Sequence, residues 1–277
     1  MITLRAAFVY SILMLAMASH SFGQQIYITN EPQKKLEQLD LATGKLTTLF
    51  AIDGEPDDLT MDSQGNLFYS VPSTGTIYRY DPATGSNTVL VTGLKYARDL
   101  LIEPNGGTML IAMYASGEIV RFNFTTGTTT ILSKKLVTVD GLAYDPAGDL
   151  FAVANHNTIV QIDPITGAVL KTLELEPHHA TNGGDGMTYD SFTGHLWVSH
   201  DGTLGNGLIE VPTDLSDFTL YQTGKIAYPD GIKSDGKGNL YIGAIWTAVE
   251  YNIPSDTVTK SFVVKGADGV SLIPGTD

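Results

Sequence analysis

The chain repeats one unit, whose clearest copy is Tyr228-Pro229-Asp230-Gly231-Ile232-Lys233-Ser234-Asp235-Gly236-Lys237-Gly238-Asn239-Leu240-Tyr241-Ile242. This copy reads as a turn, a short strand, a tight turn and a second strand. Each copy of the unit opens on an aspartate, and these aspartates are Asp58, Asp99, Asp140, Asp185, Asp230 and Asp268. Neighbouring aspartates lie 38 to 45 residues apart, a period that is typical of the blades of a β-propeller.

Counting strands predicts six blades. Five segments each hold a complete four-stranded unit: 55–93, 95–135, 137–175, 178–225 and 227–266. Residues 25–50 supply three more strands, and residues 267–274 supply one. We therefore predict an all-β fold, a six-bladed β-propeller whose C-terminal strand closes the N-terminal blade and leaves no open sheet edge.

The N-terminus predicts secretion. Arg5 precedes an apolar run over residues 6–18, and Ser21-Phe22-Gly23 provides small residues for cleavage, which together are typical of a signal peptide. Thirteen apolar residues are too few to span a bilayer. We expect a signal peptide over residues 1–23, a propeller domain over residues 24–277, and a monomeric extracellular or periplasmic protein.

Charge and cysteine content exclude several classes of function. The formal net charge is −14, and without a basic stripe the chain is not expected to bind nucleic acid or an anionic membrane. The chain has no cysteine, which excludes disulfides, a catalytic thiol and a thiolate metal site. No Gly-x-Ser-x-Gly elbow is present, so a serine hydrolase is not expected.

The six repeated aspartates are the candidates for chemistry. In a propeller the innermost strands all start at one face, so we expect these carboxylates to meet at one mouth of the channel. One interpretation is that Asp-Gly only forms the entry turn of each inner strand. The other is a cation site, because clustered carboxylates oppose one another's ionisation and oxygen ligands suit Ca²⁺ or Mg²⁺. We favour the cation site.

Loops expected at the same mouth carry further candidates. His156 and His200 could act as general bases or ligands, or could simply form hydrogen bonds within their loops. Tyr114, Tyr228 and Trp246 could form an apolar wall with hydrogen-bonding edges, although propeller cores use such residues as well. Glu31, Arg98 and Asp201 lie in segments expected at the same mouth, with no role assigned to them.

The Asp230 segment resembles the Pro-Asp-Gly-x-x-x-Asp-x-x-Gly-x-Leu-Trp-Val motif of the gluconolactonase/regucalcin/luciferin-regenerating-enzyme family of six-bladed propellers. The resemblance implies that Asp230 binds a divalent cation and accepts a proton. Counting blades backwards, it places Asp185 where the family has a metal-binding Asn. It places Asp58 where the family has a metal-binding Glu.

The resemblance also bears on the substrate. Val137 and Val139 stand where the sugar-lactone enzymes of the family carry Arg and Asn, so we expect a substrate less polar than a sugar lactone. Our first hypothesis is a secreted hydrolase of a small lactone or ester that depends on Ca²⁺, or alternatively on Mg²⁺ or Zn²⁺. The metal ligands would be Asp58, Asp185 and Asp230; the proton acceptor would be Asp230 or His200; and the substrate would contact Asp140, Tyr114, His156 and Trp246.

Two alternatives remain open. One is a propeller enzyme of natural-product biosynthesis, a cyclase, pericyclase or isomerase, because the fold by itself does not define the reaction. The other is a binding propeller without catalytic activity, in which a cation only stabilises the channel.

Overall fold

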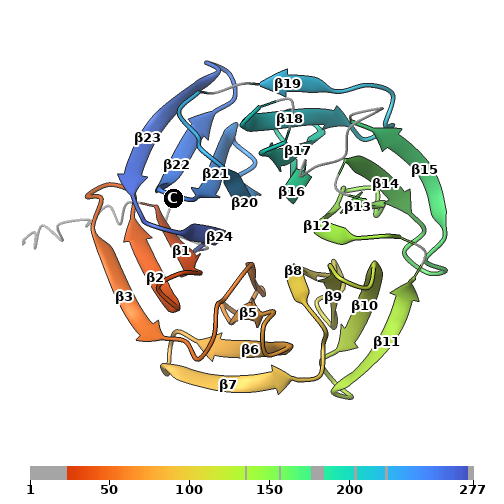
Figure 1. The fold of residues 1–277 in the computed structure, drawn as a ribbon, viewed down its shortest axis with the longest axis horizontal. Coiled ribbons are helices and arrows are strands. Elements are labelled where there is room, and N and C mark those ends of the chain that lie inside the picture. The colour runs from red at the N-terminus through yellow and green to blue at the C-terminus, as the bar shows by residue number, and fades with distance from the viewer. Residues whose placement is uncertain are drawn as a thin grey trace, which may run out of the picture.

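A computed structural model describes residues 24–134, 136–155, 157–175, 184–202, 205–221 and 224–273. These residues form six antiparallel sheets of four strands each, and the sheets stand as blades in a ring around a central axis (Figure 1). The predicted six-bladed, all-β propeller is confirmed. The predicted signal peptide, residues 1–23, lies outside the described residues. No helix capable of crossing a membrane is found in the described part of the chain.

The first three blades are given from the inner strand outward. The first blade consists of β24 (Ala267–Leu272), β1 (Gln25–Asn30), β2 (Lys35–Asp40) and β3 (Leu46–Ala51). The second consists of β4 (Leu59–Met61), β5 (Leu67–Val71), β6 (Thr76–Asp81) and β7 (Ser86–Val91). The third consists of β8 (Ala97–Ile102), β9 (Thr108–Met113), β10 (Glu118–Asn123) and β11 (Thr128–Ser133).

The other three blades follow the same order. The fourth consists of β12 (Val139–Tyr144), β13 (Leu150–Ala154), β14 (Thr158–Ile162) and β15 (Val169–Glu174). The fifth consists of β16 (Gly184–Asp190), β17 (His195–His200), β18 (Gly207–Pro212) and β19 (Thr219–Tyr221). The sixth consists of β20 (Pro229–Ser234), β21 (Asn239–Ala244), β22 (Thr247–Asn252) and β23 (Thr257–Val263).

The ring closes through the first blade, as predicted. Strand β24 pairs antiparallel with β1, with Ile26 opposite Leu272 and Ile28 opposite Val270. Residues from the two ends of the described chain therefore share one sheet, and no inner edge is left unpaired at that blade.

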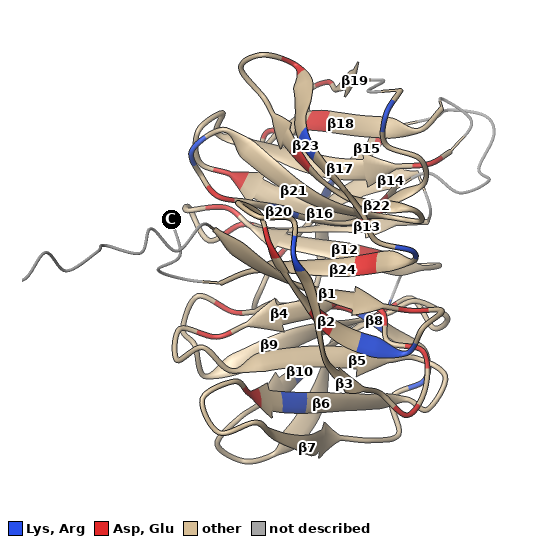
Figure 2. Ribbon diagram, turned by 90° about the vertical axis from the view of Figure 1, so that its left-hand side faces the viewer, with Lys and Arg blue, Asp and Glu red and all other residues tan. Residues whose placement is uncertain are grey.

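Apolar side chains hold neighbouring blades together. Leu36 of the first blade packs in one buried cluster with Leu59 and Tyr69 of the second. Phe151 of the fourth blade packs in the same way with Met187 of the fifth. Burial of these side chains fixes each blade against the next, so the ends of the inner strands form a rigid frame. Seen from the side, acidic positions are spread over the blades and outnumber basic ones (Figure 2), in keeping with 30 acidic and 16 basic residues in the chain.

The recurring turns at the outer ends of the blades are structural. Asp163 Oδ1 accepts hydrogen bonds from the backbone N–H groups of Ile165 and Thr166, both at 2.8 Å. Gly167 closes the same turn with a φ of 70°, a conformation that favours glycine. These Asp-Pro-x-Thr-Gly segments therefore act as hairpin caps.

The glycines that follow four of the repeated aspartates have a packing role. Gly186 lies inside β16, and a Cβ there would come within 2.7 Å of the carbonyl oxygen of Asp230 on the next inner strand. A Cβ at Gly231 would come equally close to the carbonyl oxygen of Asp268. These Asp-Gly pairs are thus not entry turns, because they lie within strands whose backbones touch those of the neighbouring blade.

Candidate functional site

The repeated aspartates occupy equivalent places at the start of the six inner strands. Five lie within the first three residues of β8, β12, β16, β20 and β24, and Asp58 directly precedes β4. The structure divides them into two groups with different partners. Asp58 and Asp99 interact with a partly buried lysine, Lys233, and the other four interact with one another and with Arg98.

The first group surrounds Lys233 of β20. Its Nζ lies 3.8 Å from Oδ2 of Asp58, and that oxygen also accepts the backbone N–H of Leu100 on the neighbouring inner strand at 3.3 Å. Burial lowers the pKa of Lys233, but the carboxylates of Asp58 and Asp99 outweigh this effect and raise the pKa above its usual range. Lys233 therefore stays charged, and the predicted metal ligand Asp58 already has a cation of the chain as its partner.

Asp99 makes a second contact of the same kind. Its Oδ2 accepts the backbone N–H of Leu142 on β12, and its Oδ1 accepts that of Leu100 at 2.8 Å. Asp58 and Asp99 are followed by leucine where the other four aspartates are followed by glycine. Side-chain carboxylates thus connect the inner strands on this side of the ring, whereas close backbone contact connects them on the other side.

Arg98 organises a second set of residues. Its Nε lies 3.0 Å from Oδ2 of Asp57, and its Nη1 lies 2.8 Å from Oδ2 of Asp140. The guanidinium also stacks 4.7 Å from the centre of the Tyr114 ring, a favourable cation–π arrangement. Two of the predicted substrate-binding residues, Asp140 and Tyr114, are thus brought together, but both already contact Arg98.

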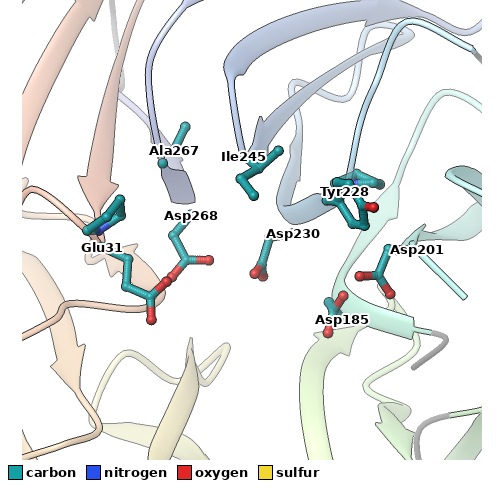
Figure 3. Close-up of a pocket in the computed structure, with 11 residues that line it drawn as sticks. Glu31, Asp185, Asp201, Tyr228, Asp230, Ile245, Ala267 and Asp268 are labelled. Carbon is teal, nitrogen blue, oxygen red and sulfur yellow. The ribbon is translucent and has the colours of Figure 1, made fainter. Parts of the chain in front are cut away.

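The remaining repeated aspartates open into a pocket of about 390 Å³, which we call the acidic pocket. Asp185 and Asp230, two of the three predicted metal ligands, line it together with Asp268 (Figure 3). Glu31 and Asp201 line it as well. The carboxyl group of Asp268 is hydrogen bonded to that of Asp230, and burial, followed by the charge of Asp230, raises the pKa of Asp268 well above its usual range.

Electrostatics make the acidic pocket a place for positive charge. Burial, followed by the charges of Asp230, Asp140 and Asp201, raises the pKa of Asp185 well above its usual range. Burial and the charge of Asp230 likewise raise the pKa of Asp201. In addition, Oδ1 of Asp201 is buried without a hydrogen-bond partner among the described residues. A proton or a bound cation would offset the unfavourable burial of these acidic groups.

The acidic pocket is not a preformed metal centre. Within the described ranges, no three His, Asp or Glu side chains are grouped as ligands of one ion. Asp58 is also absent from the residues that line the pocket. Cation binding by Asp58, Asp185 and Asp230 therefore stays a prediction. Of these three residues, Asp185 and Asp230 line the acidic pocket and Asp58 does not.

His200 does not line the acidic pocket. It is 0% exposed, and its Nδ1 lies 2.9 Å from the carbonyl oxygen of Gly205, so its ring is enclosed by protein. A buried ring cannot reach a ligand in the acidic pocket without rearrangement, so proton transfer by His200 stays a prediction. His156 lies outside the described residues.

The apolar wall differs from the predicted one. Trp246 is 56% exposed in the turn between β21 and β22, while its neighbour Ile245 lines the pocket. Val139 is buried in the core between the third and fourth blades, and Val137 is 72% exposed; neither valine lines the acidic pocket. The apolar lining comes from Tyr228, one of the predicted wall residues, and from Pro32, Pro229, Ile245 and Ala267.

Glu31, Arg98 and Asp201 were expected at the channel mouth, but the sequence indicated no role for them. Glu31 and Asp201 both directly follow strands that end at the pocket, β1 and β17. Lys233 was not predicted. It lies three residues after Asp230 in the clearest repeat, but its pairing with Asp58 joins the sixth blade to the second, and such a contact across the ring leaves no local signal.

Comparison with known proteins supports the fold. No known family model matches the chain, and no curated protein matches it in sequence. Among solved structures, it is similar to one of a nidogen/laminin complex, with a TM-score of 0.76 and 16% identity over 91% of this chain and 98% of that chain. It is also similar to virginiamycin B lyase from Staphylococcus aureus, with a TM-score of 0.65 and 16% identity over 91% of this chain and 89% of that one.

A protein of unknown function from Bacteroides caccae has a TM-score of 0.66 and 12% identity, over 91% of this chain and 99% of that chain. These neighbours include a lyase and a complex with laminin. At such identities the likeness extends to the propeller fold alone, because one fold carries many functions. The family resemblance of the Asp230 segment stays a prediction.

Proposed function

We propose that this protein is a metal-dependent hydrolase of a small lactone or ester, and that the ion and the substrate both bind in the acidic pocket. The observation that carries the proposal is the shared position of Asp185, Asp201 and Asp230 in one pocket. The nearest arginine, Arg98, is already paired with Asp57 and Asp140. Among the described residues, no lysine or arginine pairs with the pocket carboxylates alone.

The donor set fits a hard cation. Carboxylate oxygens suit Ca²⁺ best and Mg²⁺ next, whereas Zn²⁺ prefers nitrogen and sulfur ligands. We propose Asp201 as the third ligand beside Asp185 and Asp230, because the carboxylate of Asp58 faces Lys233. An ion bound there would polarise the carbonyl group of the substrate.

Residues of the chain can carry the proton transfers. Asp230 lies between the two pairs Asp185/Asp201 and Glu31/Asp268 (Figure 3), where it can take a proton from the water that attacks the carbonyl carbon. Asp230 can then give the same proton to the leaving alkoxide, while Asp185 and Asp201 stay ionised as ligands of the ion. The result is an acid and an alcohol, and Asp230 returns to its starting state.

The lining favours a substrate with apolar parts. Pro32, Ile245 and Ala267 lie on one side of the pocket, and the Tyr228 ring is 55% exposed at its rim. The side chains of Pro32, Ile245 and Ala267 offer no hydrogen bonds to a row of sugar hydroxyls. A lactone or ester with an alkyl or aryl group would gain more from contact with them.

Turnover and metal dependence test the proposal together. The purified protein should hydrolyse members of a panel of aliphatic lactones and aryl esters in Ca²⁺, and lose this activity in chelator. Asp230→Ala should abolish turnover, whereas Glu174→Gln, on the exposed outer strand β15, should leave it unchanged. An Asp230→Ala variant with the turnover of the parent protein would refute the mechanism.

A second candidate is a binding propeller without catalytic activity. It is favoured by the exposed aromatic residues Tyr96, Tyr228 and Trp246, since aromatic side chains are enriched at interfaces. If no compound of the panel is turned over while Ca²⁺ still raises the melting temperature, this candidate replaces the first. Conversion of a lipophilic substrate that chelator does not affect would instead favour the cyclase or isomerase alternative.

A further inference from the structure

The acidic pocket contains more carboxylates than one divalent ion needs. Figure 3 shows Asp185 and Asp201 on one side of Asp230, and Glu31 and Asp268 on the other. The proposed ion uses the first pair together with Asp230. The second pair, which lies where β1 and β24 meet, is left without a role.

Asp268 is the informative member of this pair. Its exposed fraction is 7%, and its carboxyl group points into the pocket (Figure 3). It is hydrogen bonded to the carboxyl of Asp230, and no N–H or ammonium group of the described residues donates to it. The side-chain partner of Asp268 is thus another acid, so a ligand that brings positively charged N–H groups would provide the donors that this side of the pocket lacks.

The balance of charge points the same way. The acids in and around the pocket are Glu31, Asp57, Asp140, Asp185, Asp201, Asp230 and Asp268, and they face one arginine, Arg98. Lys233 is engaged on the other side of the ring by Asp58. Even with a divalent ion bound, acidic groups would outnumber positive charges. A cationic ligand is therefore attracted and an anionic one repelled.

The surroundings of Asp268 define the shape of such a ligand. Pro32, Ile245 and Ala267 line the same part of the pocket and offer apolar contact, while Glu31 stands exposed at the rim. We propose that Asp268 and Glu31 bind a primary ammonium group carried on an alkyl chain, so that the substrate is an ester or lactone with a basic side chain. This inference rests on the proposed hydrolase and names its substrate class.

Direct binding tests the inference without requiring turnover. We compare 6-aminohexanamide with hexanamide, which lacks only the terminal ammonium, by calorimetry in saturating Ca²⁺. The amine should bind roughly tenfold tighter or more, because a charge-assisted hydrogen bond to a buried carboxylate is strong. Equal affinities for the two amides would overturn the inference.

Variants assign the effect to the pocket. Asp268→Asn should remove most of the preference for the amine, and Glu31→Gln, at an exposed position that folding tolerates more readily, should reduce it. Glu174→Gln removes one charge from an exposed outer strand and should keep the full preference. A preference that survives both pocket variants would contradict the placement of the ammonium.

Turnover of a matched pair of esters separates this inference from the proposed function. The pair is 4-nitrophenyl 6-aminohexanoate and 4-nitrophenyl hexanoate. Hydrolysis of both at equal kcat/KM would uphold the hydrolase and overturn the ammonium site. Selective binding of 6-aminohexanamide with hydrolysis of neither ester would overturn the hydrolase and uphold the ammonium site.

Discussion

We expect the calcium-free protein to lose stability as the pH rises from 5 to 8, the reverse of ordinary acid denaturation. Burial raises the pKa of both Asp57 and Asp140 to about 7, despite the opposing charge of Arg98. In the unfolded chain the pKa of each group lies near the ordinary aspartate value of 3.8. Between the two values the folded state holds protons that the unfolded state has lost, so stability is full below the lower value and declines through the upper one.

The size of the effect follows from the same values. For one carboxyl, the difference between 3.8 and about 7 corresponds to about 4 kcal/mol. The part lost between pH 5 and pH 8 is about 3 kcal/mol. The contributions of Asp57 and Asp140 do not add, because both contact Arg98 and titrate as a coupled set.

Urea unfolding followed by circular dichroism at pH 5, 6, 7 and 8, in chelator, measures this loss. Asp140→Asn removes one of the groups and should make the free energy of unfolding depend less on pH. Glu174→Gln should lose stability with rising pH as steeply as the parent protein. Saturating Ca²⁺ should flatten the dependence on pH in part, because an ion bound at Asp230 would offset the negative charge that helps to raise the pKa of Asp57 and Asp140. Stability that rises from pH 5 to pH 8, or an unchanged slope in Asp140→Asn, would refute the reasoning.

Three further outcomes are expected. Asp185→Asn should weaken Ca²⁺ binding at least tenfold by calorimetry, while Glu174→Gln should leave it unchanged; equal affinities would remove Asp185 from the ligand set. Lys233→Met should lower the free energy of unfolding at pH 8 by about 3 kcal/mol, because two buried carboxylates lose their cation, and acidification should restore part of it; a loss independent of pH would argue against this cause. Gly186→Ala should destabilise by about 1–3 kcal/mol, because its Cβ meets the next strand, whereas Gly107→Ala, with 3.5 Å to its nearest atom, should be tolerated.

The fold could be predicted because each blade is built from local signals. An aspartate at the start of the inner strand and a hairpin turn at the outer end recur in successive units, and their number fixes the blade count. Even the closing of the ring followed from counting strands, since three at one end and one at the other make a complete sheet. These signals are short-range, so a single sequence carries them.

The site could be predicted only in part, because its contacts cross the ring. Asp185 and Asp230 lie in one pocket, as the repeat suggested, but Asp58 lies with Lys233 of a blade that is distant in sequence. His200 ends a strand that is buried over its last five residues, and a mouth position alone could not reveal that burial. Val139 belongs to the core for the same reason, since both faces of an inner strand are covered.

The closing of the ring has a consequence for biosynthesis. Glu31 and Asp268 come from opposite ends of the described chain, and they reach the same pocket only after β24 has paired with β1. While the ribosome is still adding the last blade, the acidic pocket is incomplete. Glu31 and Asp268 come together only when the final strand emerges, so loss of that strand should open both the pocket and the ring.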